Sequence, residues 1–425
     1  MPSMMTFSIR PLDLMRSLSL ALDMAIVGIS MHQWRTTMIC HGIEEELRLD
    51  RQERERLLAA SFMHDLGAAS YTEERASLLD PNSEKLMGRV LYRHATHGCA
   101  LLRDSGIFAP LAELVRYHHD RWDGGNPSGL KGDAIPLSSR IIHLADRVEV
   151  LIRKDFPILS QREEICRIVR KESGDKFDPM VVDAFLRCSG RESFWLDLNN
   201  SNYIPLFINK MAVWGAADYT AEEVLGIAGL YATLIDRMCA FTATHSRSVS
   251  RVAALLAAKA GFCNTELTMM SIAGLLHDLG KLSVPNAILN KPASLTREEL
   301  YIIRQHPYYT YRILEQVENF SAIASWGALH HETLDGHGYP FKIHANDLPL
   351  GARIMAVADI FVALAEDRPY RARMPMNSIK RTMRGMLKDG KIDKHSAEIL
   401  FDSSQDAESI IRKDQENESP SGQDQ

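Results

Sequence analysis

The sequence has no Cys-x-x-Cys pair, no long run of basic residues and no apolar stretch of membrane-spanning length. Its six cysteines are scattered over 425 residues, which fits reduced thiols better than a disulfide framework. The most apolar early segment, LALDMAIVGISM, is interrupted by Asp23 and is far shorter than the roughly 20 residues of a membrane span. The start of the chain also lacks the layout of a signal peptide. We therefore expect a cytoplasmic protein without a membrane partner.

The overall composition is that of a soluble globular protein. The formal net charge is −6, and hydrophobic residues make up 45% of the chain, which is enough for sizeable cores. Nothing in this balance indicates a nucleic-acid polymer as the main partner. At roughly 100 to 200 residues per domain, the length predicts two or three units, of which we expect two.

The local patterns are helical, and no alternating run predicts a substantial sheet. The stretch HSRSVSRVAALLAAKAG spaces its apolar residues as a helix does and ends on Gly261. Asn264 resembles an N-cap before TELTMMSIAGLLHDLG, and Gly280 is a natural stop. We therefore expect an all-α protein in which His277 and Asp278 lie at the end of a helix.

The histidines reveal a tandem repeat offset by about 213 residues. In the first copy, successive members of the pattern are 32, 30, 24 and 27 residues apart, and in the second copy they are 32, 29, 24 and 28 residues apart. The first copy comprises His32, His64, Asp65, His94, His118, His119 and Asp146. The second copy comprises His245, His277, Asp278, His306, His330, His331 and Asp359.

The repeat predicts the domain organisation. We expect the first domain at about 8–190 and the second at about 221–402, joined by a connecting segment at 191–220 that contains LDLNNSNYIP. The polar end of the chain, 403–425, has few aromatic residues and predicts a disordered tail.

Each copy of the pattern offers five imidazoles and two carboxylates, a set that suits a pair of divalent metal ions. Imidazole binds iron, zinc or nickel, and a carboxylate can bridge two ions. Any single histidine is more simply explained as a core or surface residue with ordinary hydrogen bonds. Seven residues repeated at matching spacing favour metal sites, because such sites are identified by complete ligand sets.

Three motifs of the second repeat resemble the HD-GYP family, a branch of the HD metal-dependent phosphohydrolases. They are HDLGK at 277–281, HHETLDGHGYP at 330–340 and AVADIFVALAEDRPYR, which contains Asp359. The resemblance implies two tandem all-helical HD-type domains, and a second domain that hydrolyses a cyclic dinucleotide, chiefly cyclic di-GMP, in bacterial signalling.

The resemblance also implies the roles of the metal ligands. Asp278 would bridge the two ions and is a catalytic residue by this assignment. The first ion would be bound by His245, His277, Asp278 and Asp359. The second would be bound by His306, His330 and His331, together with Asp278. Phe241 replaces the glutamate with which some family members bind a third ion. We therefore expect two divalent transition-metal ions, and iron and manganese are the first candidates.

Further residues match the positions with which the family contacts substrate. Lys281 resembles the catalytic lysine that contacts the scissile phosphate, and Arg368 and Arg371 resemble a second phosphate clamp. Tyr339 and Pro340 are expected at the mouth of the site, in a turn that Gly336 and Gly338 allow; a purely structural turn is the alternative. Thr333 and Leu334 replace the Arg-Trp common in the family, a departure that can alter substrate preference.

The first repeat keeps the ligand pattern but departs from the family elsewhere. Ala68 occupies the lysine position, Asn126 to Ser128 replace Gly-Tyr-Pro, and Asp155 and Ile158 are the counterparts of the two arginines. This repeat therefore predicts a possible second site with up to two more metal ions. A different phosphate-ester substrate, a regulatory role and a pairing role all stay open.

The sequence thus predicts a cyclic-dinucleotide phosphodiesterase, with cyclic di-GMP as the first expected substrate. The mixed dinucleotide 3′,3′-cyclic GMP-AMP is the alternative substrate. A nucleotide-responsive binding module with little turnover is the alternative from a different class. A signalling-protein partner and a homodimer are both open.

Overall fold

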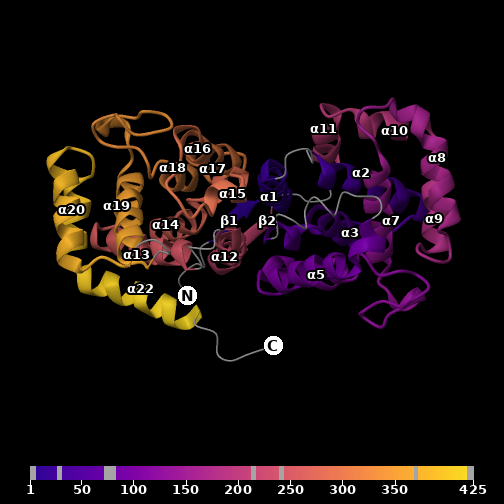
Figure 1. The fold of residues 1–425 in the computed structure, drawn as a ribbon, viewed down its shortest axis with the longest axis horizontal. Helices are drawn as coiled ribbons and strands as arrows, with labels where there is room; N and C mark the ends of the chain where they lie inside the picture. The colour runs from indigo at the N-terminus through magenta and orange to yellow at the C-terminus, as the bar shows by residue number, and fades with distance from the viewer. Residues whose placement is uncertain are drawn as a thin grey trace. The chain divides into compact units, whose positions relative to one another are not determined.

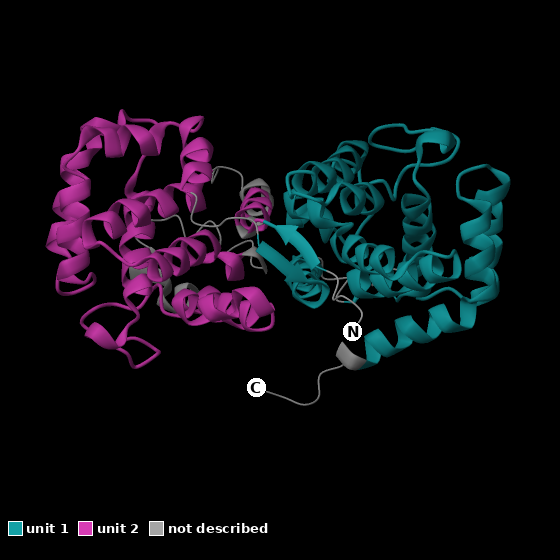
Figure 2. Cartoon of the chain, turned by 180° about the vertical axis from the view of Figure 1, so that it is seen from behind, with its two compact units in different colours: residues 1–9, 217–425 teal, residues 10–216 magenta. Residues whose placement is uncertain are grey.

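The computed structural model describes residues 6–25, 31–70, 83–211, 217–238, 244–367 and 372–418. The chain divides into two compact units (Figure 2). Unit 2 comprises residues 10–216 and carries the first repeat, and unit 1 comprises residues 1–9 and 217–425 and carries the second. Among the described residues, no helix combines the length and the apolar character needed to cross a membrane.

Unit 2 is built from helices and short 3₁₀ turns (Figure 1). Its described α-helices are α1 (Pro11–Ala25), α2 (His32–Leu47), α3 (Arg51–Met63), α5 (Ser83–Arg103), α6 (Ala112–Arg116), α7 (Leu137–Leu151), α8 (Ile158–Lys171), α9 (Pro179–Cys188), α10 (Glu192–Asn199) and α11 (Tyr203–Lys210). Its 3₁₀ turns are η1 (Leu66–Ser70), η2 (Gly106–Leu111) and η3 (Gly132–Ala134). Helix α2 packs against α3 and α7, and α5 packs against α6 and η1.

Unit 1 repeats this arrangement and adds a short sheet. Its described α-helices are α12 (Ala221–Met238), α13 (His245–Lys259), α14 (Asn264–Leu276), α15 (Asn286–Leu289), α16 (Arg297–Ile303), α17 (His306–Leu314), α18 (Ser321–Ala328), α19 (Leu350–Ala365), α20 (Met376–Lys388), α21 (Lys394–Asp402) and α22 (Ser404–Glu418). Its 3₁₀ turns are η4 (Leu279–Ser283) and η5 (Ala345–Asp347). Helix α13 packs against α14 and α19, as α2 packs against α3 and α7 in unit 2.

The sheet consists of two antiparallel strands, β1 (Thr6–Ile9) and β2 (Ala217–Thr220), with Thr6 opposite Thr220. Phe7 and Ile9 are buried, whereas Thr6 and Ser8 are exposed, which is the alternation of a half-buried strand. The prediction of an all-α fold is confirmed, with this small sheet as its exception among the described residues.

Helix α19 shows how the sequence forms the core of unit 1. It follows Pro349, which cannot continue a preceding helix, and its apolar residues recur on one face that is buried against α13 and α18. Ile354, Ala358 and Phe361 lie on this buried face. Asp359 is thereby fixed on a helix in the interior of the unit.

The connecting segment differs from its expected bounds. Much of 191–220 folds into α10 and α11, which pack against α8 and α2 and belong to unit 2. Trp195 on α10 is fully buried, and its indole nitrogen donates a hydrogen bond of 2.8 Å to the Ser189 carbonyl. The apolar residues of these short helices therefore make the segment part of unit 2, which extends to residue 216.

The predicted disorder at 403–425 does not hold for Ser404–Glu418, which forms helix α22. Ala407 and Ile411 are buried where α22 packs against α13. Asp414 pairs with Arg251 and accepts a hydrogen bond of 3.2 Å from Ser248 Oγ. A helix that is polar on most of its surface is thus stabilised by one buried stripe. Residues 419–425 lie outside the described part of the chain.

Candidate metal centres and substrate site

In unit 1, six of the seven predicted ligands lie at or just after helix ends. His245 begins α13 and His306 begins α17. His277 and Asp278 follow the end of α14, as the sequence predicts. The remaining ligands are His330 and His331, which follow α18, and Asp359, which lies within α19.

These side chains meet in two groups that can hold metal ions: His245 with His277 and Asp359, and His306 with His330 and His331. Asp278 lies between the groups. Its Oδ2 atom is 3.1 Å from His277 Nε2, and its Oδ1 atom is 3.2 Å from His306 Nε2. The two oxygens of one carboxylate thus face opposite groups, which is the arrangement that a bridging ligand requires.

The hydrogen bonds of the histidines fit metal binding. The Nδ1 atoms of His277, His306 and His330 each lie 2.7 to 2.8 Å from a main-chain carbonyl three residues earlier. A carbonyl only accepts, so each Nδ1 carries a proton, and Nε2 is the atom through which each ring would bind a metal. His306 Nε2 and His330 Nε2 face each other at 3.4 Å. A cation between these two nitrogens would be bound by a lone pair from each ring.

The electrostatics of the two groups differ. Burial lowers the pKa of His330 to about 3 and holds the pKa of His331 well below its usual value, so both rings stay neutral and keep their lone pairs. Burial alone would lower the pKa of His277 as well, but Asp278 and Asp359 outweigh burial and raise it. The carboxylates therefore create a position that favours positive charge.

Two glutamates that the sequence did not single out orient the first histidine of each unit. His245 Nδ1 lies 2.9 Å from Glu366 Oε2, and His32 Nδ1 lies 2.5 Å from Glu149 Oε2. A carboxylate at Nδ1 fixes the tautomer and leaves Nε2 for a metal. The spacing pattern could not find them, because Glu149 follows its aspartate by three residues and Glu366 follows Asp359 by seven.

Glu332 organises the loop that follows the histidine pair. Its Oε1 accepts hydrogen bonds from the main-chain N–H groups of Phe341 and Lys342, and its Oε2 accepts one from Ile343. Gly336 has a φ of 73°, as the predicted turn requires. A Cβ at Gly338 would approach the Glu332 Cα to 2.5 Å, so glycine is required there for space.

The loop brings Tyr339 against the predicted metal ligands. The Tyr339 ring stacks on His331 with centroids 4.8 Å apart, and the Arg304 guanidinium lies 4.3 Å from the same ring. Sequence reasoning missed Arg304, which belongs to no motif. Pro340 follows in the half-buried part of the loop, while Leu334 packs on a small apolar cluster around Leu329.

Lys281 is adjacent to the carboxylate predicted to bridge the two ions, with Nζ 2.5 Å from Asp278 Oδ2. Burial alone would raise the pKa of Asp278, but His277 and Lys281 hold it well below its usual value. Asp278 is therefore ionised in this setting. Arg368, Arg371 and Phe241 lie outside the described residues, so their roles stay predictions.

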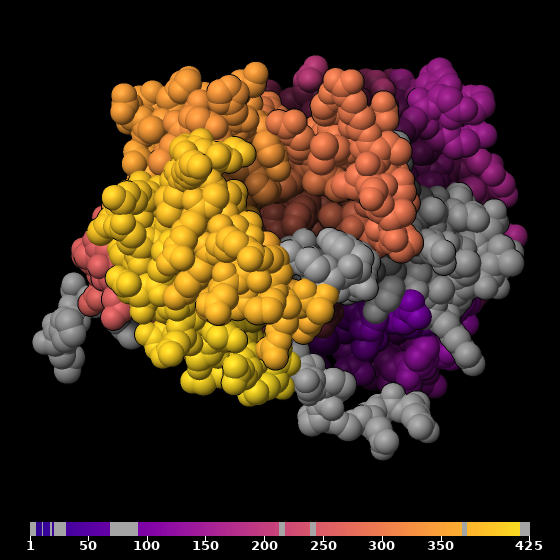
Figure 3. All heavy atoms as spheres, turned by 60° about the vertical axis from the view of Figure 1, so that its left-hand side comes forward, coloured from indigo at the N-terminus to yellow at the C-terminus, as the bar shows by residue number. Residues whose placement is uncertain are grey.

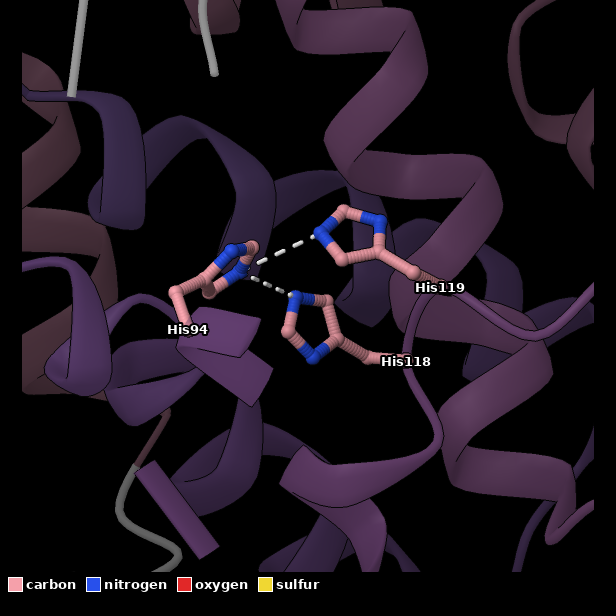
Figure 4. A group of neighbouring side chains, drawn as sticks. All are labelled: His94, His118 and His119. Carbon is pink, nitrogen blue, oxygen red and sulfur yellow. Dashed lines mark hydrogen bonds between the residues drawn. The ribbon is translucent and has the colours of Figure 1, made fainter. Parts of the chain in front are cut away.

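Unit 2 assembles the corresponding seven residues in the same way. Asp65 Oδ2 lies 3.3 Å from the Nε2 atoms of His32 and His64, and its Oδ1 lies 3.4 Å from His94. Figure 4 shows the His94 ring facing both His118 and His119, with Nε2 separations of 3.2 Å. Asp146 Oδ1 lies 3.3 Å from His32 Nε2. The predicted second ligand set is therefore spatially complete.

The surroundings of this second set differ from those in unit 1. The lysine position is taken by the buried Ala68, and of the two arginine counterparts Asp155 is exposed and Ile158 is buried. The Arg147 guanidinium donates two hydrogen bonds, of 3.0 and 2.8 Å, to Asp146 Oδ2. In unit 2 the positively charged Arg147 thus pairs with a predicted metal ligand. The residue of unit 1 at the position of Arg147 is the uncharged Ile360.

The loop after the histidine pair in unit 2 is held by other contacts. Ser128 donates a hydrogen bond to Asp120, which takes the place of Glu332. Asn126 accepts a hydrogen bond from the Arg121 main-chain N–H at 2.8 Å, and its side-chain amide donates one to the Leu130 carbonyl at 2.8 Å. The Asn-Pro-Ser stretch therefore closes the loop on itself.

Comparison with known proteins gives two matches to the HD-domain family, over residues 29–151 and 230–395. The chain is a tandem HD-domain protein. Each match contains one complete set of predicted ligands. The resemblance to HD-GYP cyclic-dinucleotide phosphodiesterases is confirmed as homology by the relatives.

The relatives of this tandem HD-domain protein include enzymes for two cyclic dinucleotides. The 3′3′-cGAMP-specific phosphodiesterase 1 of Vibrio cholerae is 29% identical over 405 residues, which cover 91% of this chain and 90% of the relative. The crystal structure of a cyclic GMP-AMP specific phosphodiesterase of V. cholerae is 26% identical, with a TM-score of 0.65 and coverage of 94% of this chain and 98% of the other. The cyclic di-GMP phosphodiesterase response regulator RpfG of Xanthomonas campestris pv. campestris is 38% identical over 139 residues, or 32% of this chain and 37% of the relative.

Proposed function

We propose that this protein is a metal-dependent phosphodiesterase that hydrolyses a cyclic dinucleotide at the site in unit 1. The observation that carries the proposal is the placement of Asp278. Its two oxygens face different histidine groups, and Lys281 lies beside it. A nucleotide-responsive binding module with little turnover would have less need of a carboxylate placed between two groups of histidines, because it does not have to activate a water.

The residues of unit 1 would hold two divalent transition-metal ions, for which iron and manganese are our first expectations. Bound there, such a pair supplies an activated water and neutralises phosphate charge during in-line displacement. The chain itself contributes the orientation of the ligands, through Glu366 and the carbonyls behind the histidines. It also contributes the Lys281 ammonium, which can compensate charge that develops on the phosphate.

The substrate belongs to the cyclic dinucleotides, and two members of this class deserve equal weight. Cyclic di-GMP is the first expectation from the motifs of the second repeat. The relative that aligns with nine-tenths of this chain is named for 3′3′-cGAMP, so 3′,3′-cyclic GMP-AMP is supported at least as well. A cytoplasmic location fits either substrate; a homodimer and a signalling-protein partner stay open.

Unit 2 would hold up to two further metal ions without hydrolysing the cyclic dinucleotide. Its ligand set is complete, but the residue in the lysine position is Ala68, and Arg147 is engaged with Asp146. A regulatory role, a pairing role and a different phosphate-ester substrate are all compatible with this arrangement.

The test is turnover of cyclic di-GMP and 3′,3′-cyclic GMP-AMP by the metal-loaded full-length chain. We expect hydrolysis of at least one, its loss in Asp278→Ala and its retention in Asp65→Ala, the matched change in unit 2. Binding of either dinucleotide without turnover would support the binding module instead. Equal losses in the two variants would contradict the division of labour between the units.

A further inference from the structure

A cavity of about 460 Å³ opens directly beside the metal ligands of unit 1. At one end it is lined by His330, His331 and Asp359. From there the cavity extends between α19 and α20. Figure 3 shows the molecule from the side on which the yellow helix α20 lies. Its volume falls within the range of about 300 to 1,000 Å³ typical of small-molecule sites.

Away from the ligands, the cavity walls are apolar. Helix α19 contributes Ile360 and Leu364, helix α20 contributes Met386, and Ile392 also lines the cavity. Thr382 on α20 also lines the cavity, and its hydroxyl donates to the Ser378 carbonyl at 3.1 Å. This hydroxyl therefore keeps its lone pairs available to accept a hydrogen bond from a ligand.

The cavity depends on small side chains that unit 2 does not share. Ala356 and Ala363 line it from α19, and their counterparts on α7, 213 positions earlier, are His143 and Val150. The buried His143 ring lies 6.0 Å from the His119 ring. At a third wall position, unit 2 has the buried Arg147 engaged with Asp146. Larger side chains thus occupy the counterparts of three wall positions.

We propose that this cavity binds one purine base of the cyclic dinucleotide, an inference that rests on the proposed function of unit 1. A phosphodiester held at the metal ligands carries a nucleoside on each side, and the cavity begins at those ligands. Apolar walls suit the two faces of a planar ring, and the Thr382 hydroxyl suits the exocyclic amino group that adenine and guanine both carry. The cavity therefore recognises the purine class without selecting between its members.

The experiment measures nucleotide binding rather than turnover. The probes are GMP, AMP and orthophosphate, titrated into metal-loaded protein that carries Asp65→Ala to remove the unit 2 site. We expect the monophosphates to bind at least about tenfold more tightly than orthophosphate, the scale of burying one base. Ala363→Phe and Met386→Trp fill the cavity from opposite walls and should abolish this preference, while orthophosphate binding persists.

Ala365→Phe is the matched control, because this residue lies on the same helix but lines a separate cavity beside α22. It should keep the preference for the monophosphates. The proposal is overturned if both cavity variants keep the preference for the monophosphates over orthophosphate. It is also overturned if the protein without these two substitutions shows no such preference. Should one variant fail to fold, the other decides. Protein that prefers the monophosphates but hydrolyses neither cyclic dinucleotide would support the base site and overturn the proposed hydrolysis.

Discussion

His245 Nδ1 and Glu366 Oε2 lie 2.9 Å apart in unit 1, although Glu366 has no counterpart at the matching position of unit 2. There Glu149, on the next turn after Asp146, performs the same task for His32. The residue of unit 1 that aligns with Glu149 is Val362. Spacings of three and seven residues return to the same side of a helix, so the orienting carboxylate has moved by one turn while its contact is kept.

Glu366→Ala should weaken metal binding in unit 1 by about 10- to 100-fold, the usual effect of losing a group that orients a ligand. Adding Val362→Glu to this variant places a carboxylate where unit 2 has one and should restore much of the affinity. The measurement is competition with a chelator for anaerobically loaded protein. Glu149→Ala, the control, should weaken unit 2 alone. Wild-type affinity in Glu366→Ala would contradict the assigned role.

The full-length protein should bind up to four transition-metal ions, two in each unit, because both ligand sets are spatially complete. Asp278→Ala and Asp65→Ala should each remove the ions of one unit, since each deletes the carboxylate that faces both histidine groups. Elemental analysis of anaerobically prepared protein gives the stoichiometry. A wild-type value of two or fewer, unchanged by Asp65→Ala, would mean that the ligand set of unit 2 does not hold metal.

Gly280→Ala should destabilise unit 1 by about 1 to 3 kcal/mol, the usual cost of overpacking a core. A Cβ at this position would lie 1.9 Å from the His306 carbonyl oxygen, so the helix that begins with this ligand would have to move. Gly385→Ala is the control: it lies within α20, with no atom near its added Cβ, and should stabilise by about 0.5 to 1 kcal/mol. Urea unfolding of the two metal-free variants compares their stabilities. Equal unfolding midpoints for Gly280→Ala and Gly385→Ala would contradict the predicted clash at Gly280.

The sequence predicted the ligand sets because they recur at the same spacing, and the predicted residues meet in space. It predicted that Gly280 ends the helix, whereas α14 ends at Leu276 and Gly280 lies within η4. The close approach of Gly280 to His306 depends on tertiary packing that spacing does not reveal. Glu366 and Arg304 escaped prediction for a related reason. Each acts across the fold, on His245 and Tyr339, and neither belongs to a repeated motif.

The elements that were missed depend on a few residues or on distant partners. Strand β1 is four residues long and pairs with β2, more than 200 positions later, so local pattern carries no signal for it. Helix α22 is polar overall, and its buried residues Ser404, Ala407, Ile411 and Asp414 form a stripe at helical spacing. The mean composition of the segment predicted disorder, because only four of the fifteen residues decide how the helix packs.

The phosphate-contacting residues should separate catalysis from metal binding. Lys281→Ala should lower kcat more than it raises KM if its charge acts mainly as negative charge develops on the phosphate. Arg368→Ala and Arg371→Ala should weaken substrate binding by about 1.5 to 3 kcal/mol, as for a lost hydrogen bond to a charged group. Steady-state kinetics beside metal analysis tests all three, and metal should be retained throughout. Wild-type kinetics would remove the phosphate-contact assignment, and loss of metal would assign the residue to the ligand cage.

Asp414→Ala should destabilise unit 1 by about 1 to 3 kcal/mol, because the fully buried Ser248 hydroxyl loses its acceptor. The Arg251 side chain is 55% exposed, so its ion pair with Asp414 adds little to this cost. Glu416→Gln, an exposed change on the same helix, should stay within about 0.5 kcal/mol of wild type. Since α13 begins with His245, loss of α22 packing should also make metal release from unit 1 faster, whereas release from unit 2 should be unchanged. Chemical unfolding and chelator-driven release measure the two effects, and coincident unfolding curves for Asp414→Ala and Glu416→Gln would show that α22 contributes nothing to the stability of the unit.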